Sequence, residues 1–170
     1  MLDRKVADLL NQQINKEFYS AYLYLDFSNY FNDRELSGFS NWYRIQAQEE
    51  RDHAMLFLQY LQNNSESVKL EAIDRPSVEL TDDITVLKAG LEHERYVTSL
   101  IHAIYEAAYD VRDFRTMQFL DWFVKEQGEE EKNADTMVKR YELYGSDPKS
   151  LYMLDSEMAA RVYTAPSLVL

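Results

Sequence analysis

Six side chains able to bind or orient a cation are spread over two similarly spaced halves of this chain. They are Glu17, Glu50 and His53 in the first half, and Glu94, Gln127 and Glu130 in the second. The spacing between the first two residues is the same in both halves, and the last two stand one helical turn apart, on neighbouring positions of one helix face. Four helices could therefore direct these side chains to one central point, an arrangement that has a chemical purpose only if a cation sits there.

The glutamates fall on the apolar faces of the segments that carry them. Glu17, for example, has Ile14 and Ala21 beside it at about 100° per residue. An unpaired buried carboxylate costs several kcal/mol or takes up a proton. One such residue could reach solvent from the end of a core, but four at the middle of four apolar faces need a shared cation. Carboxylates and one imidazole, in a chain with no cysteine, favour iron or manganese over zinc. We therefore expect two iron ions bridged by Glu50.

The elements that must position these residues are long helices. Apolar residues recur at helical spacing through most of the chain. The chain has only four glycines and three prolines, so few positions favour a turn or a loop. The pattern predicts helices over about 4–32, 36–62, 81–111 and from a turn near 113 to just before 145, with a short fifth over 147–160. Residues 63–80 lose the periodicity and are long enough to travel the length of a bundle. We expect an all-α fold, a four-helix bundle with one long crossover between helices 2 and 3 and a short C-terminal helix.

Size and charge exclude several classes of function. A chain of 170 residues is expected to form a single domain over 1–170. Its formal net charge of −12 disfavours nucleic acid and anionic membranes as partners and concentrates cations nearby. No apolar run approaches the roughly 18 residues that span a bilayer. The first ten residues include charged side chains from position 3 onward and lack the apolar region of an export signal. Together with the lack of cysteine, this pattern suggests a cytoplasmic protein.

At the same residues the sequence resembles bacterial non-haem ferritins over nearly its whole length. The motifs that carry the resemblance are Glu17 followed by Tyr24, the run QEERDH over 48–53, Glu94, and the run EQGEE over 126–130. The resemblance implies a ferritin-like fold and a ferroxidase centre in each subunit of a hollow 24-subunit shell. Ferrous iron, with O2 or H2O2 as oxidant, would be the substrate, and the ferric product would be stored inside as an oxyhydroxide mineral.

The resemblance also assigns roles to individual residues. The first iron would be bound by Glu17, Glu50 and His53. The second would be bound by Glu50, Glu94 and Glu130, with Gln127 hydrogen-bonding at the site. A third iron site would be formed by Glu49, Glu126 and Glu129 together with Glu130. Tyr24 would be a hydrogen-bond partner of the centre and could donate an electron to it.

The chain departs from symmetric di-iron proteins in its second half. Gln127 and Glu130 stand where a bacterioferritin would show E-x-x-H, so the two iron sites should differ in affinity. Asp52 occupies the place of the haem-ligating methionine of bacterioferritins, and we therefore expect no haem. Gly128 costs roughly 1 kcal/mol relative to alanine inside a helix and could make room near the centre. His93 lies off the ligand-bearing face and is expected at the surface or on a flank.

Other interpretations remain open from the sequence alone. The acids at 49, 126 and 129 could form a solvated acidic face, and Tyr24 could be a core tyrosine with a satisfied hydroxyl. The whole chain could be a di-iron enzyme that acts on another substrate, such as peroxide, in a small oligomer. It could also be a metal-free helical interaction module, in which case the acids should face solvent.

Overall fold

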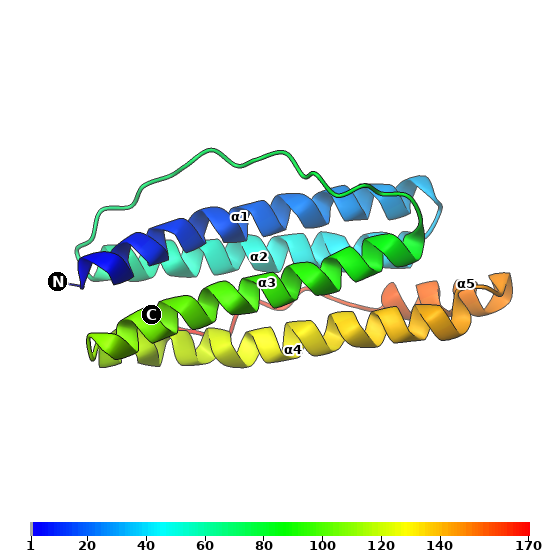
Figure 1. Ribbon diagram of the computed structural model, residues 1–170. Coiled ribbons are helices and arrows are strands. Elements are labelled where there is room, and N and C mark those ends of the chain that lie inside the picture. Colours follow the sequence, from blue (N-terminus) through cyan, green and yellow to red (C-terminus); the bar gives the residue numbers. More distant parts are fainter. Residues whose placement is uncertain (1) are drawn as a thin grey trace.

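The computed structural model describes residues 2–170 and consists of five helices in the described part of the chain. They are α1 (Arg4–Asp33), α2 (Ser37–Asn63), α3 (Asp83–Asp110), α4 (Phe114–Tyr144) and α5 (Pro148–Met158). α1 packs along α2 and α3 packs along α4, while α5 contacts α2 and α4 (Figure 1). The predicted all-α four-helix bundle with a short fifth helix is confirmed, and the helix ends lie within about two residues of the predicted ones.

Aspartates fix where four of the helices begin. Asp3, Asp82, Asp113 and Asp147 are N-cap residues, and each accepts hydrogen bonds from backbone N–H groups of the following turn. The Asp82 carboxylate, for example, lies 2.9 Å from the backbone nitrogen of Thr85. Such a bond satisfies an N–H group that has no partner within the helix. α3 begins at Asp83, two residues later than the predicted start at residue 81.

Three helices end in the same tight turn. Glu35, Ser65 and Arg112 follow α1, α2 and α3, and each has a positive φ of 57–59°. In each case this residue and the next donate backbone hydrogen bonds back into the last helical turn, which is the pattern of a Schellman motif. Gly145, after α4, has helical backbone angles instead (φ −70°, ψ −18°).

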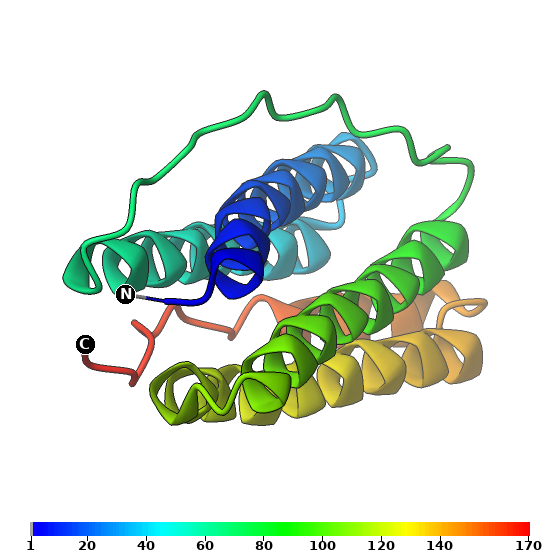
Figure 2. The ribbon, with the colours of Figure 1, turned by 60° about the vertical axis from the view of Figure 1, so that its left-hand side comes forward.

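The two long segments outside the helices both run along the bundle. The crossover from α2 to α3 lies along α1 (Figures 1 and 2). Asn11 anchors it, because its amide donates to the Ser67 carbonyl at 3.1 Å and its Oδ1 accepts from the Lys69 amide at 2.8 Å. The C-terminal segment, residues 159–170, turns back from α5 and runs past α2 and α4 (Figure 2). Its last part is tied to α4 by a hydrogen bond of 3.0 Å between Trp122 and Ser167.

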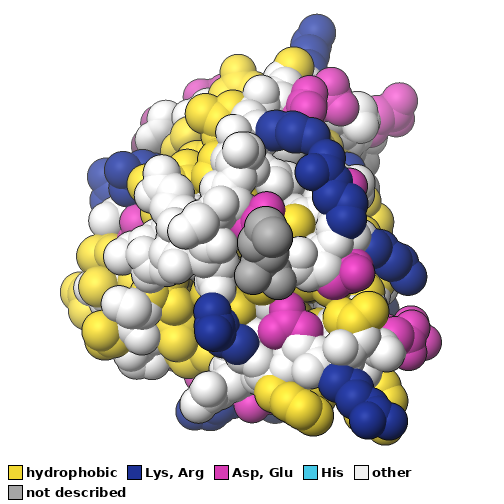
Figure 3. Space-filling model, turned by 90° about the vertical axis from the view of Figure 1, so that its left-hand side faces the viewer, with side chains coloured by type: hydrophobic (Ala, Val, Ile, Leu, Met, Phe, Trp, Pro, Cys, Tyr) yellow, Lys and Arg dark blue, Asp and Glu magenta, His cyan; other side chains and the backbone are white. Residues whose placement is uncertain are grey.

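The apolar core consists of two clusters separated along the bundle. One gathers around Leu10, Ile14, Phe57 and Phe123, and the other holds Leu23, Phe27, Phe31, Phe39 and Leu87 among its members. The glutamates of the sequence pattern lie between these clusters. At the end of the bundle drawn in Figure 3, acidic, basic and apolar side chains are interspersed. Among the described residues, no helix is both long enough and apolar enough to cross a membrane.

Candidate metal centre

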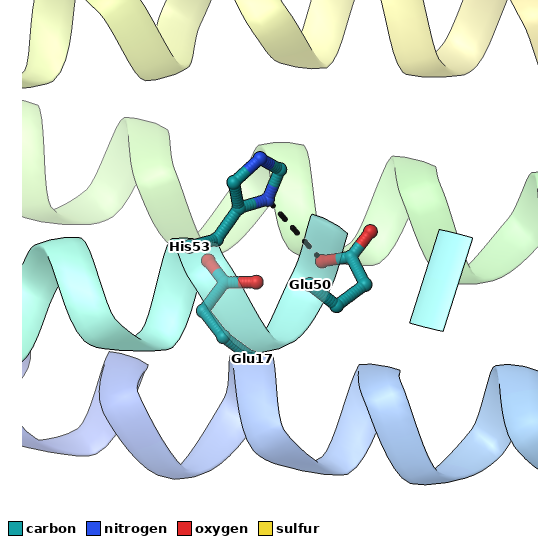
Figure 4. Close-up of side chains that lie close together, drawn as sticks. All are labelled: Glu17, Glu50 and His53. Carbon is teal, nitrogen blue, oxygen red and sulfur yellow. Dashed lines mark ion pairs between the residues drawn. The ribbon is translucent and has the colours of Figure 1, made fainter. Parts of the chain in front are cut away.

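Glu17, Glu50 and His53 meet at one buried point between α1 and α2. Each offers a ligand atom within 4.8 Å of those of the other two, and all three side chains are buried. Figure 4 shows Glu17 approaching from α1 while Glu50 and His53 project from successive turns of α2. His53 Nδ1 lies 3.4 Å from Glu50 Oε2. The prediction that these three side chains converge is confirmed, and their donor set suits a divalent metal ion.

The second half of the pattern is buried against the first. Glu94, Gln127 and Glu130 are all buried, on α3 and α4. The Gln127 amide donates to Glu94 Oε2 at 3.2 Å, as expected for a residue that orients a carboxylate. The phenol of Tyr24 donates a hydrogen bond to Glu94 Oε1 from the other side. These contacts place Glu94 in a fixed orientation between α1 and α4. The six residues are thus buried side chains of the bundle interior, and the alternative in which the acids face solvent is wrong.

Burial changes the protonation of these groups. Loss of water, followed by repulsion from Glu50, raises the pKa of Glu17 and of Glu130 from about 4.5 to about 8. The same causes raise the pKa of Glu94 well above its usual value. Burial opposes the charging of His53, but its hydrogen bond to Glu50 and that carboxylate's charge raise the His53 pKa to about 10. Without metal, the site therefore holds Glu50 paired with a histidinium and stores protons on the other acids.

Two glutamines that the sequence pattern did not single out support the carboxylates. Gln13, one helical turn before Glu17, donates to its Oε1 at 2.8 Å. Gln46, one turn before Glu50, donates to Glu50 Oε1 at 3.1 Å and to Glu130 Oε2 at 2.8 Å. Glu17 Oε2 is the one buried side-chain oxygen or nitrogen without a hydrogen-bond partner in the described part of the chain. An unpartnered buried carboxylate oxygen beside Glu50 and His53 fits a position left for a cation.

His93 is half-buried and packs beside Tyr24, in agreement with the predicted position on the flank of the ligand-bearing face. Its Nε2 lies 2.7 Å from the hydroxyl oxygen of Ser20, and its ring packs edge-on against Tyr24, with 5.7 Å between ring centroids. Burial lowers the pKa of His93, which favours the neutral form of its ring. The only sequence signal for this arrangement is that His93 directly precedes Glu94.

The acids expected to form a third site lie at the edge of the centre. Glu49 and Glu126 are half-buried and Glu129 is exposed. Glu49 is paired with Arg161 of the C-terminal segment, and Glu129 lies 3.7 Å from Lys125. Burial raises the pKa of Glu49 and of Glu126. No described group of three metal-binding side chains includes these acids, so their role stays a prediction.

Gly128 relieves no steric conflict among the described residues. A Cβ atom built there would meet no atom within 4 Å. The expectation that this glycine makes room near the centre is therefore wrong.

Fold and site together define a class of protein. A four-helix bundle with one long crossover, whose interior carries glutamates and a histidine from facing helices, is the architecture of carboxylate-bridged metal proteins. The family model described as a ferritin-like domain matches residues 7–144. The chain belongs to the ferritin family.

Individual relatives agree with this assignment. The bacterial non-haem ferritin of Staphylococcus saprophyticus is 34% identical over 163 residues, which are 96% of this chain and 98% of that protein. That of Campylobacter jejuni is 35% identical over 91% of this chain and 93% of its own. Among solved structures, an engineered closed form of the Archaeoglobus fulgidus ferritin superposes with a TM-score of 0.93 at 41% identity, over 96% of this chain and 100% of that one. The predicted resemblance to bacterial non-haem ferritins is confirmed.

Proposed function

We propose that this protein stores iron as a ferroxidase. Two ferrous ions bind at the buried centre, each gives one electron to O2 or H2O2, and the ferric product passes to a mineral inside a shell of 24 chains. Membership of the ferritin family supports iron storage. The observation that carries the ferroxidase proposal is the buried convergence of Glu17, Glu50 and His53, with an oxygen of Glu17 that has no other partner among the described residues.

The two ions would be held differently. Glu17, Glu50 and His53 would bind the first, and Glu50, Glu94 and Glu130 the second, with Glu50 as the bridge. The first set includes an imidazole, whereas the second is all carboxylate and is supported by Tyr24 and the Gln127 amide. Because a nitrogen donor strengthens binding of iron relative to an all-oxygen site, the first ion should bind more tightly. The second would then be the one that moves on, by way of Glu49, Glu126 and Glu129 at the edge.

Protons must leave when iron binds. Ligands bind metal in their deprotonated form, and the raised pKa values of Glu17, Glu130 and His53 mean that these groups hold protons at neutral pH. Reduction of O2 to the peroxide level by two ferrous ions consumes two protons. Protons released by the ligands would be available at the place where that reduction occurs.

The decisive experiment is aerobic addition of ferrous iron to the metal-free protein, with ferric absorbance and particle mass measured on one sample. Rapid oxidation far beyond two irons per chain, in a particle of about 24 chains, is the expected result. Oxidation that stops at two irons in a small oligomer would instead indicate a di-iron enzyme with another substrate. Rates no higher than in buffer would rule out ferroxidase activity.

A pair of variants tests whether iron oxidation depends on the buried centre. Glu50→Gln removes the bridging carboxylate and should reduce oxidation at least tenfold, or about 1.4 kcal/mol in barrier terms. Glu92→Gln is the matched control, because Glu92 is an exposed glutamate on α3 whose one ion pair among residues 2–170 is with Arg95. Equal rates in the two variants would show that the activity does not depend on the buried centre.

A cytoplasmic location, which we also propose, is tested by cell fractionation.

A further inference from the structure

Arg161, in the C-terminal segment, reaches the edge of the metal centre. Its Nη1 donates to Gln46 Oε1 at 2.8 Å and to the Trp42 carbonyl at 3.3 Å, and its Nη2 donates to Glu49 Oε2. The guanidinium also stacks on the Trp42 ring, 4.2 Å from the ring centroid. These four side-chain contacts are all to α2, although Arg161 is more than a hundred residues further along the chain.

The guanidinium therefore acts on the proposed ligands from two directions. Directly, it neutralises Glu49. Indirectly, it holds the Gln46 carbonyl, so that the Gln46 amide nitrogen faces Glu50 and Glu130. The side chains of Arg161 and Glu49 are only 15% and 17% exposed. A charge-assisted hydrogen bond that is largely shielded from water is stronger than a surface ion pair.

We propose that Arg161 is a positioning residue of the iron centre. Its guanidinium pairs with the Glu49 carboxylate while no metal ion is bound there, and a metal ion that binds Glu49 displaces it. This inference rests on the proposed function of the same site. A divalent ion bound by Glu49 would repel the guanidinium and compete for the same oxygen. The last ion to bind would therefore have to displace Arg161, which would loosen the C-terminal segment from α2.

Zinc tests this competition without any redox step, because Zn2+ has one stable oxidation state. We would titrate the metal-free protein with Zn2+ by calorimetry. Arg161→Met keeps an unbranched stem against Trp42 but removes the charge and the donors. It should strengthen binding of the last Zn2+ at least tenfold. Arg161→Lys keeps a positive charge beside Glu49 but lacks the guanidinium's bonds to Gln46 and Trp42, so its gain should be smaller than that of Arg161→Met.

Two further variants assign the effect to Glu49. Tyr163→Phe changes the same segment, because the Tyr163 hydroxyl donates to Asp52, but it leaves the guanidinium in place and should not alter the titration. In the double variant Glu49→Gln with Arg161→Met, the gain should disappear. Coincident titrations of the Arg161→Met and parent proteins would overturn the proposal. So would a gain that survives in the double variant.

Tryptophan fluorescence gives a readout that keeps Arg161 in place. Trp122→Phe leaves Trp42 as the single tryptophan and removes the ring that packs on His53. Emission of Trp42 should change as the last Zn2+ binds, and this change should be absent when Arg161→Met is added. An emission that stays constant through saturation would contradict displacement. Because Zn2+ binding needs no oxidation, these outcomes are independent of whether iron is oxidised.

Discussion

The phenol of Tyr24 on α1 donates a hydrogen bond to Oε1 of Glu94 on α3. This bond joins the two halves of the bundle at the level of the metal centre. Glu94 Oε2 accepts from Gln127 on α4, so donors from two helices fix one carboxylate. Tyr24 is itself enclosed by Phe27, Tyr43 and His93. These ring contacts fix the position of the buried Tyr24 side chain, and therefore of its hydroxyl.

Replacing Tyr24 with phenylalanine should slow iron oxidation without unfolding the protein. With iron bound, Glu94 would be an ionised ligand. A hydrogen bond to a charged group contributes about 1.5–3 kcal/mol, so its loss should cost on the order of tenfold in rate. Stopped-flow ferric absorbance measures the effect. Tyr105→Phe is the control, because Tyr105 makes an equivalent bond to Asp121 in an exposed position. If both variants oxidise iron at the parent rate, Tyr24 has only a packing role.

The stability of the metal-free protein should fall as pH rises from about 5 to about 8. Glu17 and Glu130 have folded-state pKa values raised to about 8 from about 4.5, so the folded chain binds more protons than the unfolded chain within this window. His53, raised to about 10 from 6.5, acts in the same direction above pH 6.5. Thermal unfolding of chelator-treated protein across this range measures the slope.

Single variants identify the source of that slope. Glu17→Gln removes one titrating group and should flatten the dependence, while Glu92→Gln on the exposed face of α3 should leave it unchanged. Stability that rises across the window in the parent protein would show that these acids are ionised in the folded state.

Much of the fold could be predicted because its signals are local. Helical periodicity located all five helices to within about two residues of their ends. Burial of Glu17, Glu50 and Glu94 could be predicted from their places on apolar faces, since each face must turn inward. The convergence of Glu17, Glu50 and His53 was predicted from the spacing of the pattern.

The support around the site could not be predicted in the same way. Gln13 and Gln46 bond to acids four residues further along their helices, but glutamine at that spacing is common on exposed helix faces as well. The contact of Arg161 with Glu49 joins an irregular segment to the middle of α2, and no periodic signal connects them. Its place depends on where α5 ends and turns, which is a property of the packed bundle.

Gln127→Glu should tighten metal binding and destabilise the metal-free protein. The change replaces the amide that donates to Glu94 with an additional carboxyl group in contact with Glu94. Repulsion between buried acids costs energy without metal, whereas another anionic ligand favours a cation. Calorimetry should therefore show tighter Zn2+ binding in the variant. Thermal unfolding without Zn2+ should show a lower midpoint than the parent protein, and added Zn2+ should raise the midpoint of the variant more than that of the parent. Gln12→Glu, on α1 and not buried, is the control. Weaker Zn2+ binding in Gln127→Glu would show that the amide is needed to hold Glu94.

Gly38 and Gly128 should respond oppositely to alanine. A Cβ at Gly38 would lie 1.7 Å from the Asp155 carbonyl oxygen, so α5 would have to move and the 2.9 Å bond from the Phe39 amide to Asp155 Oδ1 would be lost. Overpacking of this kind costs about 1–3 kcal/mol.

At Gly128 a Cβ meets no atom within 4 Å of its position, and alanine should stabilise α4 by roughly 1 kcal/mol through helix propensity. Hydrogen exchange separates the two effects. Gly38→Ala should accelerate exchange of the α5 amides, because the docking of α5 on α2 depends on that close approach. Gly128→Ala should slow exchange in the middle of α4. Unchanged α5 protection in Gly38→Ala would mean that α5 is held by α4 alone, through contacts such as the ion pair between Arg140 and Glu157.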